Sequence, residues 1–398
     1  MRASEIVRHL CRPVVACVDV RRLRVLLGIV DALLTSSRLS LTALGRALAS
    51  DAAPKHRIKR IDRFLGNPHV WNERLLYYNA LAGRLLGRSR RPVVLLDWTQ
   101  LVGPYWALTA AIASVGRAVP IYNEAHPKAR VANREVQRAF LATLSRILPV
   151  GSKPVIVADA GFKTPFFHIV REMGWDFVIR LRGRCSLKRE WPREYLPFKR
   201  AFAMATSEAR SLGDWIPYAQ NHWWPYRIIL GPKPVRSTRR RKAGYYQRRA
   251  LEPWLLATTI QSELPRVIVE LYAKRMQIEE TFRDTKNVRF GWSLDHAGSR
   301  SAERLDLLLL VASLALTAAL LAGAAAEERG LARRHQANTV RSQRVISLVR
   351  LGVYALLSAT TELALRHVTT KRLLLAVYVQ RPFQRALPFT RLRAGKWT

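Results

Sequence analysis

Three acidic residues that lie far apart in the chain, Asp97, Asp159 and Glu279, have the chemistry needed to bind divalent cations. Asp97 follows the apolar run 93–96 and Asp159 follows the apolar run 155–158, so each is expected at the end of a buried strand. The carboxyl ends of strands are where α/β sheets place their sites. Two such carboxylates, joined by a third from a helix, can hold two hard cations about 4 Å apart. Because Mg²⁺ prefers oxygen ligands, we expect two Mg²⁺ ions, with Mn²⁺ as a substitute, and cleavage of phosphodiesters.

The third acid is selected by a helix predicted over 271–286. At about 100° per residue, one stripe about 80° wide carries Tyr272, Arg275, Glu279, Arg283 and Lys286. Glu280 and Asp284 lie outside this stripe. A tyrosine, three cations and one carboxylate on one face suit a site that holds DNA phosphates beside a metal ion. The alternative is a helix with ion pairs four residues apart, Arg275 with Glu279 and Glu279 with Arg283.

The composition favours a nucleic-acid partner. The 398 residues include 67 Lys and Arg against 28 Asp and Glu, a formal net charge of +39, and 49% are hydrophobic. Such a chain can form a large core, and its charge needs a polyanion such as nucleic acid or an anionic membrane. A generally basic protein without a polyanionic partner is the alternative.

The cysteines and one apolar segment bear on location. Cys11, Cys17 and Cys185 have no paired spacing, which argues against a disulfide scaffold or structural zinc site and fits a reducing cytoplasm. Residues 307–326 carry no charge and have the length of a membrane span. We expect a buried core helix there, with a true span as the alternative.

The N-terminal part, residues 1–90, is predicted to be a helical DNA-binding domain. A short helix over 40–48, a turn and a basic helix over 55–65 have the outline of a helix-turn-helix DNA reader. The alternative is a solvated amphipathic helix. The candidate DNA contacts of the basic helix are Lys55, Arg57, Lys59, Arg60 and Arg63.

From residue 91 the pattern changes to α/β. Strands are expected over 93–96, 155–158 and 177–182, with a helix over 131–148. Residues 91–300 are predicted as the catalytic domain, interrupted by a β-rich insertion at about 184–262 that contains a basic loop at 236–249. Residues 301–398 are predicted as a helical region, in part packed on the core and in part used for dimerisation.

The chain resembles the insertion-sequence-four family of transposases, which includes those of the Tn ten and Tn five elements, and is closest to the Tn ten type. The spacing of Tyr272, Arg275, Glu279 and Lys286 is that of the family's YREK signature. Matching stretches occur in the family's order across nearly the whole chain, at 41–46, 55–67, 94–98, 158–163, 252–258, 275–284 and 336–341.

The resemblance implies an RNase H-like core, a mixed sheet flanked by helices, whose metal-binding DDE triad falls on Asp97, Asp159 and Glu279. It implies cut-and-paste transposition: cleavage at terminal inverted repeats, a DNA hairpin, and joining of the 3′ ends to target DNA by a homodimer in a synaptic complex. It implies no membrane role and a place in the bacterial cytoplasm, at the nucleoid. Residues 40–65 would read the repeats.

The resemblance also assigns residues around the hairpin. Tyr272, Arg275 and Lys286 would hold its phosphates, and Arg180 would lie near the site. Trp254 would stack on a flipped-out base, which fits the stacking that a sharp bend must replace; a core-packed tryptophan is the alternative. Two other functions stay open: an RNase H-fold nuclease without strand transfer, and a DNA-binding repressor without catalysis.

Overall fold

The computed structural model describes residues 1–87, 89–114, 116–183, 186–217, 224–234, 252–289, 291–337, 339–340, 343–358 and 363–368. The basic loop predicted at 236–249, Cys185 and residues 369–398 lie outside these residues. Statements below refer to the described part of the chain.

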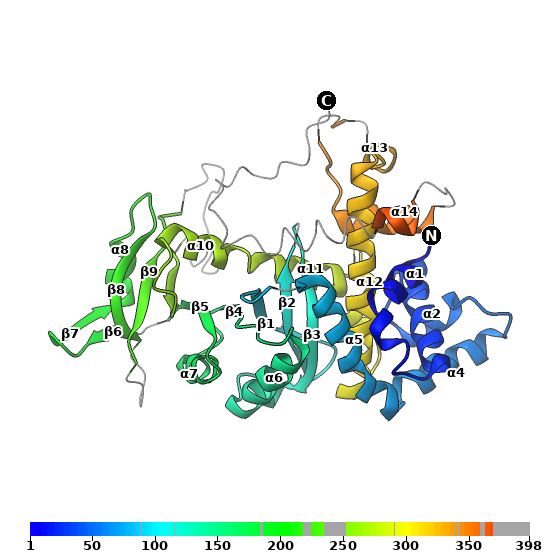
Figure 1. Ribbon diagram of the computed structural model, residues 1–398, viewed down its shortest axis with the longest axis horizontal. Helices are drawn as coiled ribbons and strands as arrows, with labels where there is room; N and C mark the ends of the chain where they lie inside the picture. Colours follow the sequence, from blue (N-terminus) through cyan, green and yellow to red (C-terminus); the bar gives the residue numbers. More distant parts are fainter. Residues whose placement is uncertain are drawn as a thin grey trace.

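Ten strands form one mixed sheet (Figure 1). They are β1 (Val93–Gln100), β2 (Tyr105–Ala113), β3 (Ala118–Pro127), β4 (Val155–Ala158), β5 (Asp176–Leu181), β6 (Ser186–Arg189), β7 (Glu194–Pro197), β8 (Arg210–Pro217), β9 (Tyr226–Leu230) and β10 (Leu255–Thr258). Their order across the sheet is β3-β2-β1-β4-β5-β10-β9-β8-β6-β7. β1 is antiparallel to β2, and β2 to β3, whereas β1, β4 and β5 run parallel. The predicted α/β class with a mixed sheet is therefore confirmed.

The prediction that the first strand ends at Asp97 was wrong. The parallel pairing of β1 with β4 stops at Leu96 opposite Ala158, but β1 continues to Gln100 because β2 pairs with it on the other side. Asp97 thus directly follows the parallel pairing of β1 with β4, and it lies within the antiparallel pairing of β1 with β2, opposite Thr109. β4 does end at Ala158, directly before Asp159.

Helices cover both faces of the sheet. On one face lie α6 (Arg134–Ile147) and α7 (Thr164–Glu172), and on the other α10 (Pro265–Ala273) and α11 (Met276–Lys286) (Figure 1). Because side chains alternate along a strand, Leu96 packs with the first pair of helices, whereas Val93 and Leu95 join a separate core with Leu271 and Ile278. Asp97 is in step with Val93 and Leu95 and therefore lies on the face covered by α10 and α11.

The remaining helices lie mostly to one side of β3 (Figure 1). The N-terminal set is α1 (Ala3–Leu10), α2 (Val20–Ser36), α3 (Leu41–Ala47), α4 (Pro54–Leu65) and α5 (Pro68–Leu86). The C-terminal set is α12 (Ala302–Glu328), α13 (Ala332–His335) and α14 (Leu348–Leu357). One short helix, α8 (Phe198–Ala203), follows β7, and 3₁₀ turns occupy Arg12–Val14, Lys128–Arg130 and Leu294–His296.

α12 contacts β3, α2, α5 and α14 and is the central helix of this side of the molecule. Among the described helices it is the one with the length and hydropathy of a membrane span, and 94% of its most apolar window is buried inside the protein. It begins at Ser301, whose hydroxyl accepts from the Arg304 N–H. The packing matches the core helix expected over 307–326.

The close approach of α14 to α12 depends on two glycines. A Cβ at Gly352 would lie 1.7 Å from the Ala319 carbonyl oxygen, and one at Gly323 would lie 2.0 Å from that of Leu348. No larger residue fits at either position without separating the helix backbones.

Candidate active site

The residues predicted for chemistry form a row across the sheet. Leu96, Ala158 and Ile179 are register partners on β1, β4 and β5, so Asp97, Asp159 and Arg180 follow side by side. Arg180 in turn pairs with Leu256 on β10, two residues after Trp254. All of these positions are in step with Val93, Val157, Val178 and Leu256, which pack beneath α10 and α11. Two acids, a cation and an aromatic ring thus share one face.

Asp97 and Glu279 are brought together by Arg275. Its guanidinium Nη1 donates to Asp97 Oδ2 at 3.1 Å, and its Nη2 donates to Glu279 Oε1. The Arg275 and Asp97 side chains are only 10% and 13% exposed, whereas Glu279 is 42% exposed. The other Asp97 oxygen, Oδ1, accepts from the Trp98 N–H at 2.9 Å.

Asp97 lies in a region of excess negative charge. Burial raises its pKa to about 7, Arg275 opposes this rise, and Asp159 and Glu279 add to it. An additional positive charge at this position would favour the ionised form of Asp97. Asp159 and Glu279 therefore both act electrostatically on Asp97.

The helix predicted over 271–286 is divided into α10 and α11, so the single-stripe geometry was wrong. Around Lys274 and Arg275 the backbone closes bonds over three residues, Arg275 N to Tyr272 O and Ile278 N to Arg275 O, both at 3.0 Å. These tighter bonds change the angular step between Tyr272 and Glu279. Tyr272 belongs to α10, Arg275 precedes α11, and Glu279 lies in the first turn of α11.

α11 is fixed to the β2–β3 hairpin by one polar face. Gln277 Oε1 accepts from the Ser114 N–H at 2.8 Å, Thr281 Oγ1 both donates to the Ala118 carbonyl and accepts from its N–H, and Asp284 accepts from Arg117 Nε at 2.5 Å. Residues 277, 281 and 284 share one helical face. Their anchoring leaves Glu279 directed at Asp97 through Arg275.

Asp159 is positioned by a residue that the sequence reading did not single out. The Gly161 N–H donates to Asp159 Oδ1 at 2.7 Å, and a Cβ at Gly161 would lie 2.8 Å from that same oxygen. The signal was present in the sequence, because Gly161 lies within the matching stretch 158–163. Only the geometry shows that the glycine is needed for the close approach.

Arg180, Tyr272 and Trp254 form a cluster beside the acids. The Trp254 and Tyr272 rings meet edge to face with centroids 4.8 Å apart, and Trp254 is half-buried. Burial raises the pKa of the Tyr272 hydroxyl and lowers that of Arg180, an effect that Tyr272 opposes. Arg180 Nε is buried without a hydrogen-bond partner among the described residues. Trp254 packs against the core yet stays partly exposed, so both its stacking role and its core-packing role remain compatible with this position.

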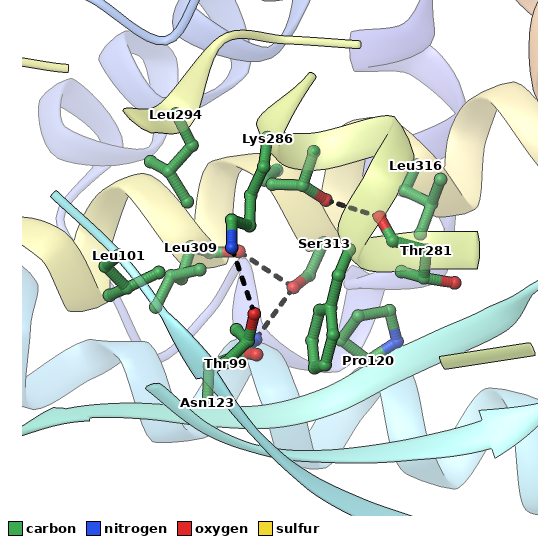
Figure 2. A pocket seen from close by; sticks show the side chains of 13 residues that line it. Thr99, Leu101, Pro120, Asn123, Thr281, Lys286, Leu294, Leu309, Ser313 and Leu316 are labelled. Carbon is green, nitrogen blue, oxygen red and sulfur yellow. Dashed lines mark hydrogen bonds between the residues drawn. The ribbon is translucent and has the colours of Figure 1, made fainter. Parts of the chain in front are cut away.

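Lys286 points into a small cavity between α11, α12 and the sheet (Figure 2). Its Nζ donates to Thr99 Oγ1 at 3.3 Å, and Thr99 is two residues beyond Asp97 on β1. The cavity has a volume of about 20 Å³, enough for one water molecule. Arg283 lies apart: it is 63% exposed and pairs with Glu280, not with Glu279. Of the two ion pairs in the alternative reading, only Arg275 with Glu279 is present.

The basic helix predicted at 55–65 is α4, and it follows α3 through a turn as expected. Gly45 of α3 packs against Ile58 of α4, and Arg57 donates to the Leu48 carbonyl at 2.9 Å, which makes Arg57 a structural tie between the helices. A groove between α2 and α4 is lined by the basic side chains of Arg21, Arg22, His56, Lys59, Arg60 and Arg63. The first three of these were not predicted as DNA contacts from the sequence. Lys55 is exposed at the start of α4.

The carboxylate ligands of the acidic site are of the type that a hard cation prefers, but the distances between them do not yet suit a bound ion. Among the described residues, no three His, Cys, Asp or Glu side chains are close enough together to hold a metal ion as they stand. The guanidinium of Arg275 bridges two of the predicted ligands. Three carboxylates, one of them buried with a raised pKa, are nevertheless a donor set suited to Mg²⁺, and the guanidinium supplies the positive charge that such a set requires.

A sheet of this order, with one acid within a central strand and another directly after the neighbouring strand, defines an α/β fold of the RNase H-like class. A family model described as "Transposase DDE domain" matches residues 110–316, just over half of the chain. The chain belongs to this family, which confirms the RNase H-like fold and a transposase with a DDE domain. The matched range includes Asp159 and Glu279, and Asp97 precedes it. No match was found among curated proteins.

Proposed function

We propose that the protein is a cut-and-paste DNA transposase of the insertion-sequence-four type. It binds terminal inverted repeats, cuts the DNA through a hairpin intermediate and joins the 3′ ends to target DNA. The observation that supports this most is the bridge that Arg275 makes between Asp97 and Glu279 on the face of the sheet where Asp159 follows the neighbouring strand. The YREK spacing and the family match point the same way.

Asp97, Asp159 and Glu279 are the residues that would hold two Mg²⁺ ions, or Mn²⁺ as a substitute. Bound there, the ions would activate the attacking oxygen and stabilise the leaving oxygen of a phosphodiester. α11, anchored through Thr281 to β3, fixes the approach of Glu279. Gly161 holds the Asp159 carboxylate by its N–H.

The cluster beside the acids suits a hairpin. Trp254 is only half-buried, so we propose that its ring stacks on a base that leaves the DNA stack, which recovers ~1–3 kcal/mol. Arg180, Lys286 and Arg275 supply positive charge for the phosphates around the bend. Arg283, exposed on α11, is placed to contact more distant DNA.

The N-terminal helices serve as the reader of the terminal repeats. The groove between α2 and α4 gathers Lys59, Arg60 and Arg63 with Arg21, so one backbone can be contacted from both sides. We further propose that the protein acts as a homodimer on paired DNA ends and that residues 301–398 form part of the dimer contact. It would work at the nucleoid, in the bacterial cytoplasm.

Replacing Glu279 tests the proposal. Glu279→Ala should abolish Mg²⁺-dependent cleavage of DNA that carries the terminal repeats flanking the coding region, and should leave binding to these repeats unchanged. The matched control is Glu280→Ala, whose carboxylate pairs with Arg283 instead. Full cleavage by Glu279→Ala would refute the triad.

The products separate the other candidate functions. A nuclease without strand transfer would cut the repeats yet give no joined products when target DNA is supplied. A repressor would bind the repeats equally well when Asp97, Asp159 and Glu279 are all changed to Ala, and the unchanged protein would cut nothing.

A further inference from the structure

We propose that Arg275 is a built-in competitor of the metal ions: without DNA its guanidinium neutralises the acidic centre, and a DNA phosphate that draws it away frees the carboxylates for metal. This inference rests on the proposed function. It adds a second task to a residue that the family resemblance assigns only to phosphate contact.

The contacts place the guanidinium where a cation is needed. Nη1 binds Asp97 and Nη2 binds Glu279, so one planar group bridges two of the three predicted metal ligands. Arginine's fork geometry is suited to holding two carboxylate oxygens at once. Since the side chain is 10% exposed, this positive charge is little screened by water.

The same oxygens cannot serve both cations well. Asp97 Oδ1 already accepts the Trp98 N–H and its Oδ2 accepts Arg275, so a metal ion at Asp97 must share an oxygen with one of these donors or displace it. A divalent ion and a guanidinium on one carboxylate repel each other in a site of low dielectric. Metal binding and the present position of Arg275 therefore oppose each other.

Arg275 is also held incompletely. Its Nε is buried without a hydrogen-bond partner among the described residues, and the further neighbour of its Nη2 is the Met276 sulfur at 3.7 Å, a weak acceptor. Met276 is 47% exposed, so the guanidinium lies close to the surface on that side. A phosphate offers several strong acceptor oxygens to the same donors. A phosphate can therefore replace the hydrogen bonds that Arg275 loses when it leaves Asp97 and Glu279.

Thermodynamic linkage makes the consequence measurable. If DNA removes Arg275 from the acids, DNA raises metal affinity and metal raises DNA affinity by the same factor. A variant without the guanidinium should already bind metal tightly and should lose this part of the coupling. The protein would then assemble its metal centre mainly on DNA, and cleavage without bound substrate would be suppressed.

The test is titration of the full-length protein with Mn²⁺, followed by the electron paramagnetic resonance signal of the free ion. Without DNA, Arg275→Ala should bind Mn²⁺ about tenfold more tightly than the unchanged protein, a factor equal to ~1.4 kcal/mol. A short DNA duplex should tighten Mn²⁺ binding to the unchanged protein more than to the variant. Arg275→Met, which keeps most of the apolar stem, should behave in the same way and guards against misfolding of the alanine variant.

Arg138→Ala is the matched control, because it removes an equal charge from α6, on the opposite face of the sheet, at a site 48% exposed and paired with Glu172. It should leave Mn²⁺ affinity nearly unchanged. Equal or weaker Mn²⁺ binding by both Arg275 variants would overturn the competition. Asp97→Asn separates this outcome from failure of the proposed function: if that variant also binds Mn²⁺ normally, the acids are not the metal site at all.

Discussion

Gly161→Ala should impair catalysis while leaving the fold intact. Gly161 is exposed, and its backbone does not lie in the left-handed region, so alanine can adopt the same conformation. The added Cβ, however, would lie 2.8 Å from Asp159 Oδ1, where ordinary contacts begin at 3.4 Å. The group that must give way is the carboxylate of a predicted metal ligand.

The size of the effect follows from this overlap. To reach an ordinary contact the carboxylate oxygen has to move by about 0.6 Å, the difference between the two distances, and the hydrogen bond from the Gly161 N–H is distorted with it. Active-site groups tolerate about 0.5 Å of displacement, and a 1 Å error can cost 10²-fold in rate. We expect cleavage to slow by ~10–100-fold and the unfolding free energy to change by less than ~0.5 kcal/mol.

The assay is single-turnover cleavage of DNA bearing the terminal repeats at saturating Mg²⁺, together with urea unfolding of each variant. Gly83→Ala is the control, since Gly83 is exposed in α5 and a Cβ there has no neighbour within 4 Å. Alanine should stabilise that helix by ~0.5–1 kcal/mol and leave cleavage unchanged. Cleavage by Gly161→Ala at the unchanged rate would show that the position of Asp159 does not limit the reaction.

Three further outcomes are expected. Lys286→Ala should keep first-strand nicking and lose hairpin product on denaturing gels, and an unaltered hairpin yield would count against its role near Thr99. Burial raises the pKa of Asp306 to about 7, although Arg74 opposes this rise. Folding therefore takes up a proton between about pH 4 and 7. The free energy of unfolding should fall as pH rises through that window. Asp306→Asn should flatten this slope in urea unfolding, and a slope identical to that of the unchanged protein would contradict the assignment. Gly352→Ala should lower stability by at least ~1–3 kcal/mol because the helix backbones must separate; an unchanged urea midpoint would show that α14 does not hold its place on α12.

Strong local patterns allowed the central elements to be predicted. The apolar runs at 93–96 and 155–158 and the alternation at 177–182 gave three adjacent strands, and the basic stretch 55–65 is α4. β2 and β3 were missed because β2 is rich in alanine, which has a low strand propensity, and the apolar residues of β3 are interrupted by Pro120, Asn123 and Glu124. Their pairing depends on partners that a local pattern cannot reveal.

The division between α10 and α11 shows a similar limit. No proline or glycine occurs in 266–286, so local propensity favours one continuous helix. The break coincides with Arg275, whose side chain reaches Asp97, 178 positions earlier in the chain. Likewise, Glu279 could be picked out by its spacing, but its indirect link to Asp97 could not, because a guanidinium between them has no sequence signature.

Strands in a sheet lie ~4.8 Å apart, and Asp97, Asp159 and Arg180 directly follow three register partners on consecutive strands. The backbone hydrogen bonds between these strands therefore set the spacing of the two carboxylates and the guanidinium. Surface loops and the N-terminal helices can change in length and charge without altering the pairing of these strands. Related proteins could in this way evolve to recognise new DNA ends while the spacing of their catalytic residues stays constant.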